Sequence, residues 1–343
     1  MAEDVGKGLG RYLVYRILLL IPLLFGVSVL TFLLVRLGDS NPAVMVAGPT
    51  ATLDQIKAIE AEMGLDRPLP VQYWTWLTNA LQGDLGTSWM SNRPVTEELW
   101  EKLPITLELI GFGMAGAILF GVVIGVASAV RQRRLLDQAL RIVTLAGVSI
   151  PIFWGALLMI TFFFSVLGWA PAPLGRVDRG LAEPPHITGM LVFDSVVTGY
   201  FATAMSALAH LALPALTISL ITGATIAKQV RAAMVETLGS SAVRYARACG
   251  MPERGVVWLA FRNALPDLIG FFGITFSLAL GGAAISELIF SWGGLGQLGL
   301  EAITNADFAA VQGFILVMGV LTAAIYLIAD LLVAAIDPRV KFQ

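Results

Sequence analysis

The chain has 343 residues, of which 57% are hydrophobic and 13% are charged, and its formal net charge is −2. A soluble domain carries about 25% charged residues, so this composition excludes a soluble globular protein and indicates a polytopic membrane protein. The single cysteine excludes an internal disulfide. The two histidines fit no zinc, haem or iron–sulfur pattern, so we expect no metal or other cofactor bound by this chain.

Six apolar segments are long enough to cross a bilayer, which takes about 20 residues of helix. Their ranges are 12–36, 104–130, 138–167, 206–227, 265–291 and 311–336. The first is longer than a signal-peptide core and no A-x-A cleavage site follows it, so we expect it to be retained. Pro151 predicts a kink in the third. The second contains five glycines that predict close contact with another helix: Gly111, Gly113, Gly116, Gly121 and Gly125.

The segment between the first two spans, residues 37–103, is too long for a plain turn. Helical spacing over 52–63 predicts a short helix that Gly64 ends. A second short helix is predicted near Pro70, with Tyr73, Trp74, Trp76 and Leu77 on it. These aromatic side chains either anchor the helix at the membrane–water interface or contact an external protein. Residues 168–205 predict an irregular loop followed by an amphipathic piece near 190–200.

Lysine and arginine gather in four places: the N-terminus, the connection 131–141, the segment 228–264 and the C-terminus with Arg339 and Lys341. With six spans, all four lie on one side of the membrane, which the positive-inside rule assigns to the cytoplasm. Residues 37–103 carry more acidic than basic side chains and lie on the other side. Both termini are therefore expected in the cytoplasm.

The basic segment 228–264 separates two long apolar segments. A helix continuing out of the fourth span is predicted to bend near Gly239, and Gly250 suits the left-handed residue that ends a helix. Pro252 and Glu253 suit the first turn of the next helix, which would bury Val256 and Ala260 and expose Arg254 and Arg262. Ala246 and Ala248 predict a narrow tip. The resulting helical finger either docks a partner or is a basic loop that only sets topology.

Three further positions have two interpretations each. Glu287, near the outer end of the fifth span, either faces a pathway and meets a substrate amine or makes a local hydrogen bond. Gly281 and Gly282 either allow close helix packing or leave room for a pathway. Glu108, near the outer start of the second span, either caps a helix or lines an outer vestibule.

The sequence lacks the features that characterise several other classes of membrane protein. An exporter or ion-coupled carrier would show intramembrane charge chains or an inverted repeat, and neither is found. A membrane enzyme would need a catalytic set such as H-E-x-x-H, and a P-loop ATPase would need G-x4-G-K-[ST]; both motifs are absent from the sequence. A non-transporting scaffold remains a possible alternative, which a pull-down for an ATPase would test.

Two motifs in segment 228–264 have a counterpart in a known family: Tyr245-Ala-Arg-Ala-Cys-Gly250 and Arg262-Asn-Ala-Leu-Pro266. They resemble the coupling loop of bacterial ABC importer permeases, in the variant of the dipeptide/oligopeptide permease family. The resemblance covers nearly the whole chain, in ordered motifs that include Leu65-Asp-Arg-Pro68, Gly83-Asp-Leu-Gly86, Leu103-Pro-Ile-Thr106, His210-Leu-Ala-Leu-Pro214, Trp292-Gly-Gly-Leu-Gly296 and Asp337-Pro-Arg339. The loop lacks the family's acidic residue, Cys249 and Gly293 replace the usual lysine and proline, and the segment between spans three and four is longer than minimal. That length puts any transfer of substrate identity in doubt.

The resemblance implies one permease domain over 1–343 with the type I ABC importer fold: six transmembrane helices, both termini cytoplasmic, in the bacterial inner membrane. It implies no enzyme activity in this chain. Its partners would be a second homologous permease, two ATPase subunits that bind ATP-Mg, an extracytoplasmic binding protein and membrane lipid, but no nucleic acid. The cargo would be dipeptides or oligopeptides, or alternatively a nickel chelate, glutathione or a glycoside. The ATPase-coupling residues would be Arg244, Tyr245, Ala246, Arg247, Ala248, Gly250, Pro252, Glu253 and Arg254.

Overall fold

The computed structural model describes residues 2–36, 42–48 and 50–336. Arg339 and Lys341, which entered the topology prediction, lie outside these residues. The described residues form helices and connections, with one isolated β-bridge between Thr87 and Pro94. The chain divides into two compact units: unit 1 is Met1–Pro104 with Gly293–Ala323, and unit 2 is Ile105–Trp292 with Ala324–Gln343.

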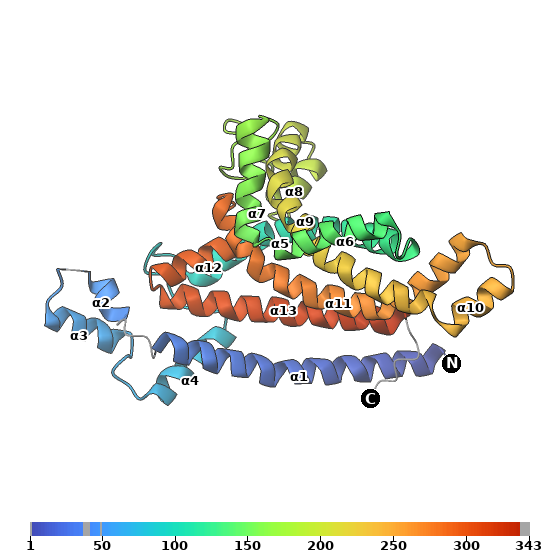
Figure 1. Cartoon of the computed structure of the whole chain (residues 1–343). Coiled ribbons are helices and arrows are strands. Elements are labelled where there is room, and N and C mark those ends of the chain that lie inside the picture. Colours follow the sequence, from blue (N-terminus) through green and yellow to red (C-terminus); the bar gives the residue numbers. More distant parts are fainter. Residues whose placement is uncertain (1, 37–41, 49, 337–343) are drawn as a thin grey trace. The chain divides into compact units, whose positions relative to one another are not determined.

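Unit 2 is built around the long helix α9 (Phe201–Leu238), which packs against α6 (Leu135–Ser149), α7 (Ile152–Met159), α8 (Leu191–Val197), α10 (Ser241–Ala248) and α11 (Glu253–Ile289) (Figure 1). The π-helical segment η1 (Ile160–Val166) continues α7. Unit 2 also contains most of α5 (Val95–Val130) and the end of α13 (Phe308–Ile336). The predicted short helix near 190–200 is confirmed as α8.

Glycines of α5 lie directly against α9, as their spacing predicts. A Cβ atom on Gly121 would lie 2.5 Å from Cγ2 of Ile226, and one on Gly125 would lie 2.6 Å from Cβ of Val230. Gly113 and Gly116 are equally crowded by α9, whereas Gly111 has open space around it. Small residues allow this close approach because no side chain separates the two backbones. Four of the five predicted contacts are therefore confirmed.

Four of the described helices are long and apolar enough to cross a membrane: α5, α9, α11 and α13. A fifth crossing exists if α6 and the segment Ile152–Val166 form one broken span, because the two are bent by 105° around Pro151. Pro151 thus produces a break much larger than an ordinary kink. The predicted first span lies within α1 (Ala2–Arg36), a continuous helix of 35 residues that includes the apolar stretch Leu18–Leu34. α11 runs unbroken through Pro266.

Unit 1 contains α1, α2 (Pro42–Ala47), α3 (Leu53–Glu62), α4 (Leu69–Leu81), α12 (Leu295–Thr304) and the first parts of α5 and α13. Its core joins residues distant in sequence, namely Leu85, Val95, Leu99, Leu295, Ala302 and Ala310. The two helices predicted in 37–103 are confirmed. Thr52 and Gln55 form a capping box at the start of α3, and Gly64, with φ +65°, follows its end.

Aromatic residues of α4 pack on α1. The Tyr73 hydroxyl lies 2.8 Å from Oγ of Ser28, and the Tyr73 ring meets the ring of Phe32 edge to face at 5.3 Å. Trp76 also lies beside Phe32, whereas Trp74 is exposed. The aromatic residues of α4 therefore divide between packing inside unit 1 and an exposed face.

Candidate functional site: a helical finger between α9 and α11

The segment between α9 and α11 folds as the predicted finger. α9 ends at Leu238 and Gly239 caps it, and Ser240 begins α10 by accepting a hydrogen bond from the Val243 amide. α10 is joined to α11 by four residues that include Gly250. The finger therefore joins two helices, α9 and α11, that are each long and apolar enough to cross a membrane.

Gly250 makes the turn of the finger possible. Its φ is +79°, in the left-handed region that glycine occupies without strain. The Gly250 amide donates to the Arg247 carbonyl at 3.0 Å and the Met251 amide donates to the Ala246 carbonyl at 3.1 Å, which is the Schellman pattern. A Cβ atom at Gly250 would meet nothing within 4 Å. The requirement for glycine is therefore conformational and not steric.

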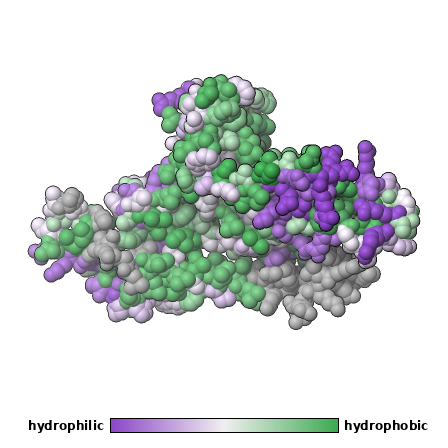
Figure 2. All heavy atoms as spheres, viewed as in Figure 1, coloured by the Kyte–Doolittle hydropathy of each residue, from purple (hydrophilic) through white to green (hydrophobic). Residues whose placement is uncertain are grey.

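Most of the predicted coupling residues lie at the surface of the finger. The exposed ones are Arg244, Tyr245, Arg247, Ala248, Gly250, Pro252, Glu253 and Arg254. The Tyr245 side chain is 74% exposed. Ala246 is buried beside Val243, because α10 is amphipathic and this side of it packs on α9 and α11. Figure 2 shows hydrophilic residues gathered over the end of unit 2 that carries α10.

The exposed face of the finger carries one ion pair across the turn and one aromatic pair after it. Arg247 donates to Glu253 at 3.1 Å, joining α10 to the first turn of α11, and both side chains are largely solvated. Trp258 is exposed and stacks on Phe261 at 6.1 Å. Tryptophan is enriched both in protein interfaces and at the membrane–water boundary. The sequence analysis did not identify Trp258, although an aromatic residue in a basic segment was an available signal.

A buried ion pair fixes the part of α9 that leads to the finger. Arg231 of α9 donates through Nε to Oδ1 of Asp137 at 2.8 Å and through a terminal nitrogen to Oδ2 at 2.9 Å. The Ser128 hydroxyl of α5 donates to Asp137 at 2.6 Å, and the Arg133 amide does so at 3.0 Å. Asp137 therefore joins α6 to both α5 and α9. Asp137 is the single acid among the arginines of 131–141, a signal that the sequence analysis missed.

The residues proposed from sequence for a pathway occupy different environments on α11. Gly281 is exposed with open space around it, whereas a Cβ atom on Gly282 would lie 3.2 Å from Cδ1 of Ile152 on α7. Glu287 is fully buried and accepts a hydrogen bond from the Thr106 hydroxyl at 2.5 Å. This geometry matches the local hydrogen-bond interpretation of Glu287 and the packing interpretation of Gly282.

Glu108 ties the connection 168–190 and α8 to α5. Its carboxylate accepts from the Leu191 and Val192 amides at 3.2 and 2.7 Å, and from Arg176 at 2.7 Å. The Arg176 guanidinium also lies 5.8 Å from the Trp292 ring centre. This arrangement matches the capping interpretation of Glu108. Among the described residues, no group of three or more histidine, cysteine or acidic side chains is placed to hold a metal ion.

Comparison with known proteins gives a consistent result over nearly the whole chain. Residues 121–342 match the family described as binding-protein-dependent transport system inner membrane component, and residues 9–110 match its N-terminal region. The chain is 39% identical to the dipeptide transport system permease protein DppB of Alkalihalophilus pseudofirmus, over 96% of this chain and 99% of that protein. It is 37% identical to the di/tripeptide transport system permease protein DppB of Pseudomonas aeruginosa, over 97% and 99%. It is 33% identical to the glutathione transport system permease protein GsiC of Escherichia coli, also over 97% and 99%.

Proposed function

The chain belongs to the inner-membrane components of binding-protein-dependent transport systems, and from this premise we propose that it forms part of the pathway of a peptide importer. It is a multi-pass protein of the plasma membrane with several apolar helices. Its partners in the proposal are a second homologous permease, two ATPase subunits and an extracytoplasmic binding protein. ATP and Mg²⁺ are bound by the ATPase subunits.

The observation that carries this proposal is the finger between α9 and α11. Its exposed face offers an aromatic and basic surface to an ATPase subunit, through Tyr245, Arg244 and Trp258. The Schellman turn and the Arg247–Glu253 pair hold that face in one shape. When ATP closes the ATPase subunits, the two fingers of the permease pair move together and α9 and α11 tilt. The pathway then opens to the outside, and hydrolysis reverses the tilt.

The proposed topology has six spans, with α1 and the broken pair α6–α7 completing the set and both termini in the cytoplasm. Cys249 gives a direct test, because it is the only cysteine of the chain and it is exposed at the turn of the finger. A membrane-impermeant maleimide is expected to label Cys249 in inverted vesicles and not in intact cells. Labelling from the outside would contradict the proposed topology.

Dipeptides and tripeptides are the proposed cargo, because relatives of nearly full length carry those names. Glutathione is the alternative cargo, because one relative is named a glutathione permease. Glutathione is itself a tripeptide with a γ-linkage, so it is chemically close to the peptides. A nickel chelate or a glycoside would be a different cargo within the same family. Competition for uptake between a labelled dipeptide, glutathione and a glycoside in the complete transporter separates these substrates.

The coupling role is tested by Gly250→Val. A β-branched residue at φ +79° is strained, so the turn must distort and the exposed face with it. We expect ATP-driven dipeptide uptake into proteoliposomes to be lost while the permease remains in the membrane. Gly180→Val is the matched control, because Gly180 also has a left-handed φ, +89°, and open space, but lies in the connection 168–190. Gly250→Asn should restore part of the uptake, since asparagine tolerates this conformation. Normal uptake by Gly250→Val would refute the coupling role.

A further inference from the structure

The turn that joins α5 to α6 exposes a group of arginines that the finger does not use. Arg131, Arg133 and Arg134 are exposed in this turn, and Arg141 is exposed about two turns further along α6. None of the four side chains forms an ion pair with a residue that the structure describes. Like charges at this spacing repel one another, so a partner of opposite charge is favoured here.

The one acid within residues 131–141 does not neutralise these arginines. It is Asp137, which is buried and already accepts hydrogen bonds from Arg231 at 2.8 and 2.9 Å and from Ser128 at 2.6 Å. Its carboxylate is therefore engaged with α5 and α9. The surface of the turn keeps the positive charge of its arginines.

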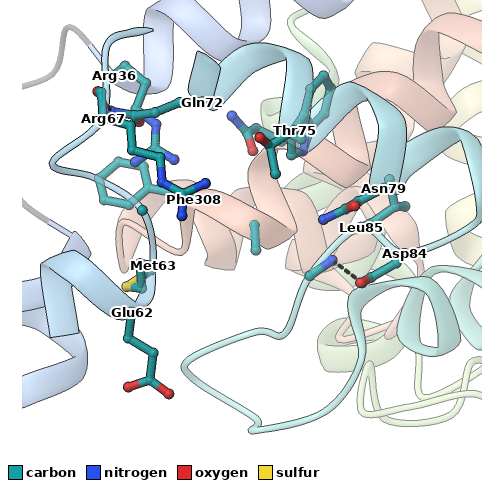
Figure 3. A pocket seen from close by; sticks show the side chains of 15 residues that line it. Arg36, Glu62, Met63, Arg67, Gln72, Thr75, Asn79, Asp84, Leu85 and Phe308 are labelled. Atoms are coloured by element: carbon teal, nitrogen blue, oxygen red, sulfur yellow. Dashed lines mark hydrogen bonds between the residues drawn. The ribbon is translucent and has the colours of Figure 1, made fainter.

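Arginines elsewhere in the chain have an acid close to them. Arg247 of the finger pairs with Glu253. Arg36 and Arg67 line an open cavity of unit 1 together with Glu62 (Figure 3). The arginines of 131–141 differ from both groups, because the acid of their own segment is bound to a fifth arginine.

The backbone of the turn is held in one conformation. Arg133 has a left-handed φ of +64°, and its amide donates to Asp137 at 3.0 Å. The Arg134 amide donates to the Arg131 carbonyl at 3.1 Å. The arginine side chains therefore extend from fixed positions at the start of α6, which lowers the entropic cost of binding an anion.

The side of α6 that follows the turn is exposed and apolar. Leu135 is 84% exposed and Ile142 is 68% exposed, and Leu145 and Val148 are exposed further along. From Leu135 to Val148 the helix rises about 20 Å, which exceeds the roughly 15 Å depth of one bilayer leaflet. The long side chain of Arg141 can extend along this surface toward the head groups. A soluble protein would match the arginines alone, whereas a phospholipid matches the arginines and the apolar side chains together.

We propose that the turn 131–134 and the exposed side of α6 bind an anionic phospholipid of the cytoplasmic leaflet. The lipid phosphate lies among Arg131, Arg134 and Arg141, and an acyl chain follows Leu135 and Ile142. Arginine suits this role because its planar guanidinium binds phosphate oxygens in pairs, and four basic residues next to a membrane helix are typical of anionic-lipid binding. The choice of leaflet rests on the topology in the proposed function, whereas the preference for an anionic head group does not.

The test is native mass spectrometry of the complete transporter in detergent. It is titrated with palmitoyl-oleoyl phosphatidylglycerol and, separately, with phosphatidylcholine that has the same chains. We expect phosphatidylglycerol to bind more tightly. Arg134→Gln and Arg141→Gln should each weaken the tightest phosphatidylglycerol binding about fivefold, and the double variant by more, with phosphatidylcholine binding unchanged. Arg134→Lys/Arg141→Lys should keep most of the preference, because lysine retains the charge.

A matched control removes the same charge elsewhere. Arg67 and Arg179 are exposed and form no ion pair with a described residue, and neither lies near α6 in sequence. Arg67→Gln/Arg179→Gln should bind phosphatidylglycerol as the unchanged protein does. Thermal unfolding of each preparation shows that the variants are folded, as expected for exposed and unpaired side chains.

Several outcomes would overturn the proposal. Equal binding of the two lipids, or equal losses in the double variant and the control, means that the arginines bind no specific lipid. Full competition by glycerol 3-phosphate means that the site takes a free phosphate, and loss of the ATPase subunits with unchanged lipid binding means that the surface belongs to them.

Failure of this inference can be told apart from failure of the proposed function. ATP-driven dipeptide uptake is measured in proteoliposomes made from the same preparations. Normal uptake without a preference for phosphatidylglycerol refutes the lipid site alone. Absent uptake of every peptide, with the preference intact, refutes the proposed function alone.

Discussion

Buried polar groups are treated differently in the two units. In unit 2 the charged side chains Asp137, Glu108 and Glu287 are buried with partners on neighbouring helices, and the helices pack so closely that only glycine fits between some of them. In unit 1 four polar atoms around one cavity have no described partner. The other four unpaired atoms of the described chain lie on three segments of unit 2. Paired buried charges fix the positions of helices, whereas unpaired polar groups contribute no hydrogen bond to the packing around them.

The largest expected effect comes from removing one partner of a buried charged pair in unit 2. Asp137→Ala removes the partner of Arg231 and should destabilise unit 2 by about 3 kcal/mol, at the lower end for a buried pair because Arg231 remains 25% exposed. Thermal unfolding of the purified protein measures the loss. Glu253→Ala is the control: it breaks the solvated Arg247–Glu253 pair and should cost at most about 1 kcal/mol. Equal costs would show that burial does not distinguish the two pairs.

Gly121→Ala tests the close packing of unit 2. The added Cβ would lie 2.5 Å from the Ile226 side chain and 2.9 Å from the backbone oxygen of Gly223, which has little freedom to move. We expect a loss of about 1–3 kcal/mol in thermal unfolding. Gly111→Ala, on the same helix with nothing within 4 Å, should be neutral or slightly stabilising, because alanine favours a helix over glycine. If the two variants unfold alike, α5 and α9 are not in the close contact described.

The smallest expected effect comes from removing an unpaired polar group of unit 1. Trp76→Phe removes an unpaired N–H but keeps an aromatic ring beside Phe32. The unfolding free energy should change by less than about 1 kcal/mol, since no hydrogen bond is lost. Thr106→Val, which removes the hydroxyl that donates to Glu287, should cost more in the same measurement. A large loss in Trp76→Phe alone would mean that its N–H already has a partner.

Much of the local structure follows from the sequence. Gly250, Pro252 and Glu253 fix the turn of the finger, and Thr52 with Gln55 and Gly64 fix both ends of α3, because caps and left-handed residues act over a few neighbouring positions. The glycine spacing of α5 likewise predicts the contact with α9. The buried and exposed sides of α10 do not follow from the sequence alone: Ala246 is buried and Ala248 is exposed, because the tertiary packing of α10 decides which side faces solvent.

The sequence by itself determined the class of protein, the apolar helices and the finger, because hydropathy, charge and capping are properties of adjacent residues. Only the tertiary structure joined Asp137 to Ser128 and Arg231, and Gln72 to Arg36 and Gln312 around one cavity. These side chains are as many as 276 positions apart, from 36 to 312. No local pattern records which of them meet, since that is decided by how whole helices pack.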